Sequence, residues 1–223
     1  MTKSALVLGS SGGIGSALVR RLSDDGWNVT GLSRSDDGFD LTDPASIARA
    51  AEGLGDRRFD LIFNATGALV IDGAEPEKTI RSIEADAMAA QFALNATGVA
   101  LALRYLSPLM RQDGRAIFAS ISARVGSIDD NRLGGWISYR AAKAAQNQIL
   151  RTAAVELTRR NPGSIVVALH PGTVETPLSA KYADHNPTIT PERSVDALLA
   201  VLDRLTPEDS GTFWDWKGER VAW

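Results

Sequence analysis

The sequence predicts a single-domain α/β fold in which helices flank both faces of a doubly wound parallel sheet. Short apolar runs alternate with longer helix-like stretches along the whole chain, a pattern typical of parallel sheets covered by helices. The first apolar run leads directly into a glycine-rich loop and an amphipathic stretch. The length of 223 residues suits one domain with a large core, so residues 1–223 are treated as a single unit without a separate substrate domain.

The expected elements follow one another in regular order. Crossovers between parallel strands are right-handed, so a ligand is expected at the carboxyl ends of the strands, where the strand order reverses. The predicted strands are Ser4–Leu8, Trp27–Leu32, Asp60–Asn64, Ala116–Ser120 and Ser164–Leu169, with a closing extended segment at Gly211–Trp216. The first predicted helix follows the glycine loop and ends at Asp25. The others lie around Ser46–Gly53, in the Ala-rich region through Asn95 to Met110, over Tyr139–Arg160 and from about Pro191 to Leu205.

The loop after the first strand reads Gly9-Ser10-Ser11-Gly12-Gly13-Ile14-Gly15. Glycine is needed where the backbone turns sharply or approaches a ligand closely. The helix that follows presents unpaired amides and a positive dipole end to a phosphate. The spacing is G-x-x-x-G-x-G, which differs from the common G-x-G-x-x-G fingerprint. A glycine loop alone can be a plain turn, but its place between strand and helix favours a nucleotide site.

Tyr139 and Lys143 lie four residues apart in an alanine-rich helical stretch, so they share one helical face. A free tyrosine has a pKa of about 10, too high for proton transfer at neutral pH. A neighbouring ammonium favours the phenolate, so Lys143 is expected to lower the pKa of Tyr139 toward the range of general acid–base chemistry. Taken alone, the pair is more typical of a solvated helix surface.

Together these two motifs resemble the short-chain dehydrogenase/reductase family, which pairs G-x-x-x-G-x-G with a downstream Y-x-x-x-K. Further motifs of the family match in the same order, and the resemblance covers essentially the whole chain. The segment GSIDDNRLGGWISYR and the ending FWDWKGERVAW are similar to the sniffer/C-factor type of short carbonyl reductases. The matching positions are Asn64-Ala65-Thr66-Gly67, Asn95, Ser122 and the segment from Pro171 to Thr176.

The resemblance implies a Rossmann-type fold and hydride transfer between a nicotinamide cofactor and a carbonyl or alcohol carbon. Tyr139 would protonate the carbonyl oxygen, and Lys143 would also hold the nicotinamide ribose. Ser122 would polarise the carbonyl, and Asn95 would hold a water through its backbone. Ser122 lies seventeen positions before Tyr139, further than usual in the family, so Ser120 remains an alternative. The family often has two serines at this place, and alignment on Gly126 puts Ala123 at the position of the second one.

The cofactor is expected to be NADP, with NAD as the alternative. At the end of the second strand, an acid binds the ribose 2′-hydroxyl of NAD, whereas an arginine binds the 2′-phosphate of NADP. This chain has Ser33 and Arg34 there, and a guanidinium can bind phosphate through two hydrogen bonds. Asp36 and Asp37 nearby oppose that charge. The alternative is a solvated loop arginine.

The remaining expected cofactor contacts come from the resemblance. Asp40 would bind the adenine amino group with Leu41 beside the ring, unless Asp40 is simply the N-cap of the next helix, a role open to Thr42 or Asp43 as well. No helix and only a very short strand are expected between residues 33 and 40. The full set is Gly9, Ser11, Gly13, Ile14, Gly15, Ser33, Arg34, Asp40, Leu41, Asn64, Ala65, Gly67, Tyr139, Lys143, Pro171, Gly172, Val174 and Thr176.

Composition narrows the possible partners. A net charge of −3 and a pI near 5.5 argue against nucleic-acid binding, and the absence of cysteine argues against thiol chemistry and zinc. No apolar stretch is long enough to span a bilayer, and the strand-like start predicts a cytoplasmic enzyme without a signal peptide. The family resemblance implies a homodimer or homotetramer. The competing hypothesis is an NAD(P)-binding signalling or redox-sensing protein with little turnover.

Overall fold

The computed structural model describes residues 2–176 and 188–223. Within them, six strands form one parallel sheet in the order β2-β1-β3-β4-β5-β6. The order reverses between β1 and β3, which pair with Leu8 opposite Asn64. The strands are β1 Ser4–Leu8, β2 Asn28–Leu32, β3 Leu61–Asn64, β4 Ala116–Ile121, β5 Ser164–His170 and β6 Thr212–Asp215.

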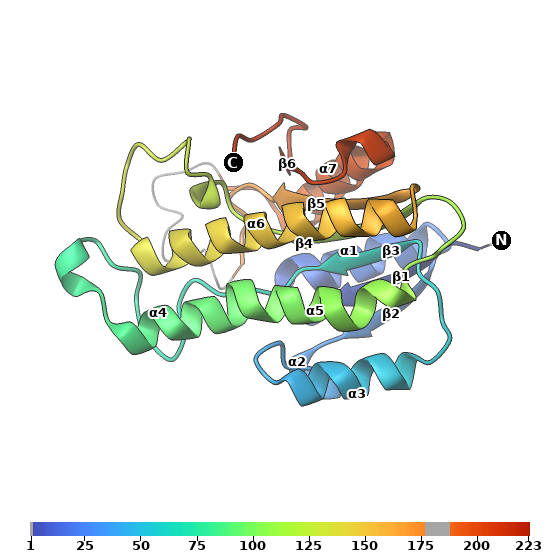
Figure 1. Cartoon of the computed structure of the whole chain (residues 1–223), viewed down its shortest axis with the longest axis horizontal. Coiled ribbons are helices and arrows are strands. Elements are labelled where there is room, and N and C mark those ends of the chain that lie inside the picture. Colours follow the sequence, from blue (N-terminus) through green and yellow to red (C-terminus); the bar gives the residue numbers. More distant parts are fainter. Residues whose placement is uncertain (1, 177–187) are drawn as a thin grey trace.

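Helices cover both faces of this sheet, so the predicted fold class is confirmed (Figure 1). One face carries α3, α4, α5 and α6, and the other carries α1 and α7, which pack against each other. The helices are α1 Gly13–Asp24, α2 Arg34–Asp37, α3 Pro44–Leu54, α4 Ala85–Phe92, α5 Gly98–Leu106, α6 Ile137–Arg160 and α7 Pro191–Arg204.

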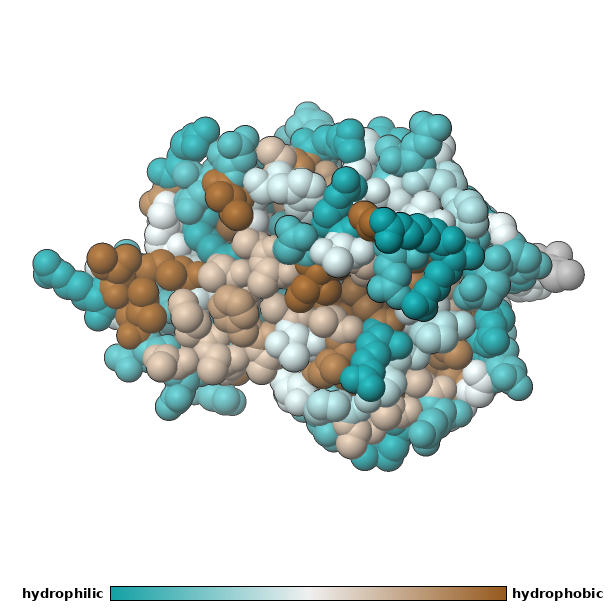
Figure 2. Space-filling view, viewed as in Figure 1, coloured by the Kyte–Doolittle hydropathy of each residue, from teal (hydrophilic) through white to brown (hydrophobic). Residues whose placement is uncertain are grey.

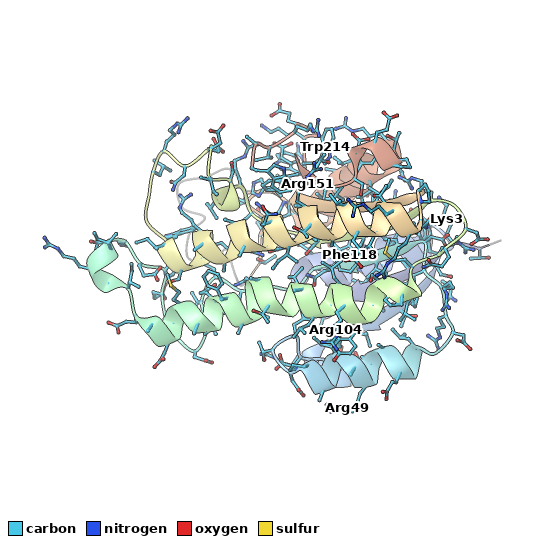
Figure 3. The ribbon with its side chains drawn as sticks, viewed as in Figure 1. Lys3, Arg49, Arg104, Phe118, Arg151 and Trp214 are labelled. Atoms are coloured by element: carbon cyan, nitrogen blue, oxygen red, sulfur yellow. The ribbon has the colours of Figure 1, made fainter. Side chains whose placement is uncertain are left out.

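The core consists of two apolar layers, one on each side of the sheet. Alternate strand residues point to opposite faces, so neighbours such as Phe118 and Ile117 belong to different layers. Phe118 is fully buried beneath α5 and α6, where Figure 3 labels it. Burial on both faces explains why the central strands are continuous apolar runs instead of alternating ones. These strands fix the position of the loops at their carboxyl ends.

The segment after β2 differs from expectation. We predicted no helix there, but Arg34–Asp37 form one helical turn, α2. Ser33 caps it by accepting a hydrogen bond from the amide of Asp36, and Gly38 ends it in the left-handed conformation with φ 64°. The next residues, Phe39 to Leu41, are outside any strand, so the expected short strand is also not found.

The Ala-rich region around Asn95 is helical, as predicted, but it is not a uniform α-helix. Residues 93–97 form a π-helical turn between α4 and α5, and the amide of Gly98 donates to the carbonyl oxygen of Ala93. Single π turns inside α-helices are frequent at functional sites because they redirect side chains. Here the turn places Asn95 on the side of the helix that faces the loop after β3.

Candidate functional site

The glycine loop joins β1 to α1 and packs against the end of β3. A side-chain carbon on Gly15 would lie 2.0 Å from the carbonyl oxygen of Gly9, and one on Gly9 would lie 3.2 Å from the backbone of Ala65. Only glycine fits this close approach. The N-cap of α1 is Gly12, which provides no side-chain hydrogen bond. The amides of residues 13–15, in the first turn, are therefore suited to binding an anion.

The segment after β5 lies over the start of α1. A side-chain carbon on Gly13 would be only 2.7 Å from Cγ2 of Thr176. Pro171 and Val174 are buried, and Gly172 has a positive φ of 84°. The structure thus brings the glycine loop and this segment together, as expected for a phosphate-binding wall. Ser11 is exposed and Ile14 is partly buried at the same loop. The family resemblance implies a short substrate lid between Thr176 and Pro191, and most of that segment lies outside the described residues.

Ser33 and Arg34 lie where β2 ends. Arg34 is exposed and opens the one-turn helix α2. The amide of Ser33 donates a 2.8 Å hydrogen bond to the carboxylate of Asp37, so an acid folds back toward the end of the strand. Arg34 and this carboxylate therefore both lie at the end of β2, where the adenosine ribose is expected.

Asp40 and Leu41 follow that turn. The Asp40 carboxylate accepts hydrogen bonds from the amide and the hydroxyl of Thr42, at 2.8 and 2.7 Å, and these bonds lower its pKa, with a smaller contribution from the charge of Arg34. Asp40 is not the cap of α3, because Asp43 is the N-cap and accepts from Ala45. Leu41 is buried, and its Cβ approaches Gly98.

Gly67 lies between two of the residues expected at the nicotinamide end. Its φ is 138°, and a side-chain carbon there would lie 2.9 Å from Oδ1 of Asn95 and 3.3 Å from Nζ of Lys143. The side chain of Asn95 holds the loop after β3 by accepting from the amide of Ala68 at 3.2 Å and donating to its carbonyl at 2.9 Å. Residues from three distant parts of the sequence therefore converge at the ends of β3 and β4.

Lys143 is buried at this point, with 2% of its surface exposed. Its ammonium donates to the carbonyl oxygen of Ile121 at 3.2 Å and to Oε1 of Gln146 at 2.8 Å. An ammonium has three N–H donors, and these two contacts involve two of them. Burial lowers the pKa of Lys143 to about 7. Its charge is therefore present below that pH and lost above it.

Tyr139 lies one turn before Lys143 on the same face of α6, as predicted. Nζ of Lys143 is 5.8 Å from the centre of the Tyr139 ring, which also packs edge-on against Trp136 at 6.4 Å between ring centres. The expected lowering of the tyrosine pKa is not found: burial raises the pKa of Tyr139, because the phenolate loses more solvation than the phenol. The phenol is therefore protonated at neutral pH, the form that can donate a proton.

The two candidate serines are both buried and both hydrogen-bonded. The Ser122 hydroxyl donates to Oδ1 of Asn147 at 2.7 Å, and the residue is 2% exposed. The Ser120 hydroxyl accepts from the side-chain amides of Asn64 and Gln146, each at 2.9 Å. In each case the hydrogen-bond partners are side chains of the protein. Ser122 and Asn147 thus join the end of β4 to α6.

Several residues of this network were missed in the sequence. Gln146 and Asn147 stand three and four positions after Lys143, so helical spacing alone would have placed them on its face. Glu77 is a buried acid in the loop after β3, and no local pattern marks it.

In the described part of the chain, no group of His, Asp and Glu side chains is arranged to hold a metal ion. No helix there is long and apolar enough to cross a membrane.

The chain is similar to several known proteins. A family model described as enoyl-(acyl carrier protein) reductase matches residues 9–211. A 1-hydroxy-2-glutathionyl-2-methyl-3-butene dehydrogenase from Rhodococcus sp. (strain AD45) is 29% identical over 98% of each chain. A Burkholderia multivorans short-chain dehydrogenase/reductase with bound NADP superimposes with a TM-score of 0.85 at 26% identity, over 100% of both chains. An NADPH-bound carbonyl reductase from chicken fatty liver gives 0.81 at 26% identity, covering 100% of this chain and 94% of that one.

The family model matches most of the chain, from the glycine loop to the residue before β6. It includes strands β2 to β5, the Tyr139–Lys143 face of α6 and the loops at the carboxyl ends of β1 to β5. These are the features by which the sequence resembled a family of oxidoreductases. The chain belongs to the short-chain dehydrogenase/reductase family.

Proposed function

We propose that this protein is an NADPH-dependent carbonyl reductase in which Tyr139 is the proton donor. The observation that carries the proposal is the partly buried phenol of Tyr139, one helical turn from a buried lysine, at the edge of the sheet that also carries a glycine loop suited to phosphate. The two solved structures described above support it, because one holds NADP and the other is a carbonyl reductase with NADPH.

The residues present fit a dinucleotide. The free amides in the first turn of α1 would bind the pyrophosphate. Glycine is required at Gly15 and Gly13, because a side-chain carbon would strike the backbone of Gly9 at the first and Thr176 at the second. Lys143 would bind the nicotinamide ribose. The other contacts would come from residues along the same edge of the sheet: Gly9, Ser11, Ile14, Ser33, Arg34, Asp40, Leu41, Asn64, Ala65, Gly67, Tyr139, Pro171, Gly172 and Val174.

The cofactor, when bound, supplies the hydride, and the protein supplies orientation and a proton. The Tyr139 hydroxyl donates its proton to the carbonyl oxygen of the substrate. Lys143 holds a positive charge one turn away, and this charge favours the developing phenolate. Asn95 fixes the loop that carries Gly67, which would place that loop beside the lysine. We assign Ser122 to joining β4 and α6 instead of polarising the carbonyl, because its proton is donated to Asn147.

The function is tested by following NADPH oxidation with a panel of aldehydes, diketones and quinones, alongside NADPH binding by fluorescence. We expect turnover with at least one class of carbonyl. Tight NADPH binding without turnover of any of them would contradict a reductase and favour the redox-sensing alternative.

The assignment of Ser122 leads to its own prediction. Ser122→Ala is expected to lower the free energy of unfolding by about 1–3 kcal/mol, because Asn147 loses its donor in a buried site. The kcat for carbonyl reduction is expected to stay close to the wild-type value. Denaturant unfolding and steady-state kinetics measure the two effects, with exposed Ser35→Ala as the control. A loss of kcat comparable to that of Tyr139→Phe would return the polarising role to Ser122.

Cofactor preference depends on Arg34. Arg34→Ala is expected to weaken NADPH binding by about 10- to 100-fold, because a hydrogen bond to a charged group contributes about 1.5–3 kcal/mol. NADH binding should not change, since NADH has no 2′-phosphate. Titration of both cofactors measures this, with Arg49→Ala, an exposed arginine of α3, as the control. Unchanged NADPH affinity would remove the assignment and favour NAD.

Assembly and location stay predictions. A homodimer or homotetramer would bury the face of α4 and the start of α6, where Figure 2 shows a pale and brown surface. Ile80, just before α4, is 76% exposed, and Ile83 is 38% exposed. The substrate is proposed to be a small molecule bound beside Tyr139, in a cytoplasmic enzyme.

A further inference from the structure

We propose that Glu77 is a positioning residue for Tyr139: its carboxylate, from the loop after β3, caps the first turn of α6. This inference rests on the proposed function. Glu77 is 8% exposed, and none of the steps above uses it. A buried carboxylate away from the reacting atoms needs hydrogen bonds to offset its lost solvation. The residue that provides them is the immediate neighbour of Tyr139.

Glu77 contacts the start of α6 through both its carboxylate and its backbone carbonyl. The Ser138 amide donates to Oε2 at 3.2 Å, and the Ser138 hydroxyl donates to Oε1. The backbone carbonyl of Glu77 accepts from the amide of Trp136 at 2.5 Å. The hydrogen bonds from Ser138 lower the pKa of Glu77, although burial is the largest single effect and acts in the opposite direction. The group is therefore a carboxylate at neutral pH.

Helix α6 has no cap of its own. Its N-cap position is Trp136, whose side chain makes no capping hydrogen bond, and its first turn contains no acidic residue. The first amides of a helix need acceptors, and negative charge there interacts favourably with the helix dipole. Glu77 provides both, although it lies 61 residues away from Ser138 in the sequence.

The chain enters α6 through an unusual backbone conformation. Gly134, Gly135 and Trp136 all have positive φ, at 66°, 67° and 52°. A tryptophan in this region is strained and persists only where its surroundings hold it there. The hydrogen bond from Trp136 to Glu77 is one such restraint. A second is Arg140, whose Nε donates to the carbonyl of Gly135 at 3.0 Å.

Tyr139 is the third residue of α6, so its position follows that of the first turn. Glu77 is therefore placed to couple this turn to the loop after β3, which also carries Gly67 beside Lys143 and Asn95. Tyr139 and Lys143, the proposed proton-transfer pair, are then both positioned relative to the loop after β3. Without the carboxylate, the first turn would fray, and the phenol would spend less time in line with the substrate oxygen.

The test compares Glu77→Ala and Glu77→Gln with wild type in the full chain. A misplacement of about 1 Å can reduce a rate by about 10²-fold, and we expect Glu77→Ala to lower kcat by about 10- to 100-fold with little change in the KM for NADPH. The glutamine keeps one acceptor oxygen, so Glu77→Gln should recover part of this loss. Glu52→Ala, which removes an exposed acid from α3, is the matched control. Amide hydrogen exchange of residues 136–143 is measured on the same proteins.

Faster exchange of that segment, together with a fall in kcat that glutamine partly restores, would support the proposal. Unchanged exchange would overturn it, and so would faster exchange without loss of kcat, because Glu77 would then be a structural cap alone. If the wild-type chain reduces no carbonyl, the proposed function fails separately. Exchange would still decide whether Glu77 holds the turn that carries Tyr139.

Discussion

Replacing Tyr139 with phenylalanine is expected to lower the kcat for carbonyl reduction by about 10²- to 10⁴-fold, the contribution typical of a positioned general acid. The substitution removes one hydroxyl and keeps the ring that packs edge-on against Trp136. The helix start and its contact with Glu77 should therefore be preserved. NADPH affinity should change little, because phenylalanine keeps the ring of Tyr139 and the glycine loop and Lys143 are untouched. Steady-state kinetics and cofactor titration measure the two effects.

Tyr105→Phe provides the matched control for this result. Tyr105 lies on α5, packs beside the core and has Arg104 over its ring. The same chemical change there should leave kcat unaltered. Wild-type kcat in Tyr139→Phe would mean that another group delivers the proton, whereas lost NADPH binding would mean that the hydroxyl acts in cofactor binding.

Much of this site could be predicted from the sequence because its signals are local. The glycine loop follows its strand directly, and the spacing of Tyr139 and Lys143 fixes their shared helical face. The one-turn helix α2 was missed although its signals were present: Ser33 is a favourable N-cap, and Gly38 is a favourable residue to end a helix. That error came from the family resemblance. The family has a helix and a full strand at this place, and the segment here is so short that we expected no helix.

Other features could not be predicted because they depend on contacts distant in sequence. The Ser122 hydroxyl donates to Asn147 on another element, so its direction is set by how β4 packs on α6. The pKa of Tyr139 is raised by burial, which a sequence does not show. Glu77 lies in a loop without periodicity, and its partner is in a helix that begins 60 residues later by number. Charge and burial must be known together to recognise such residues.

Gly15→Ala is expected to weaken NADPH binding by about 10- to 100-fold, because hydrogen bonds to a charged group contribute about 1.5–3 kcal/mol each and the first-turn amides of α1 would move. The new methyl carbon would lie 2.0 Å from the carbonyl oxygen of Gly9 and 3.1 Å from Cα of Ser10. Both neighbours are backbone atoms, so the β1–α1 turn must open. Overpacking of this kind costs about 1–3 kcal/mol in the free energy of unfolding.

The same substitution at Gly53 separates this steric effect from the general effect of adding a methyl group. Gly53 lies in α3, its φ is not positive, and a side-chain carbon there would meet nothing within 4 Å. Gly53→Ala is therefore expected to raise the free energy of unfolding by about 0.5–1 kcal/mol without changing NADPH affinity. Denaturant unfolding and fluorescence titration of both variants measure the contrast. Wild-type NADPH affinity in Gly15→Ala would show that the cofactor phosphates bind elsewhere, since the loop could not accept that carbon without moving the amides proposed to hold them.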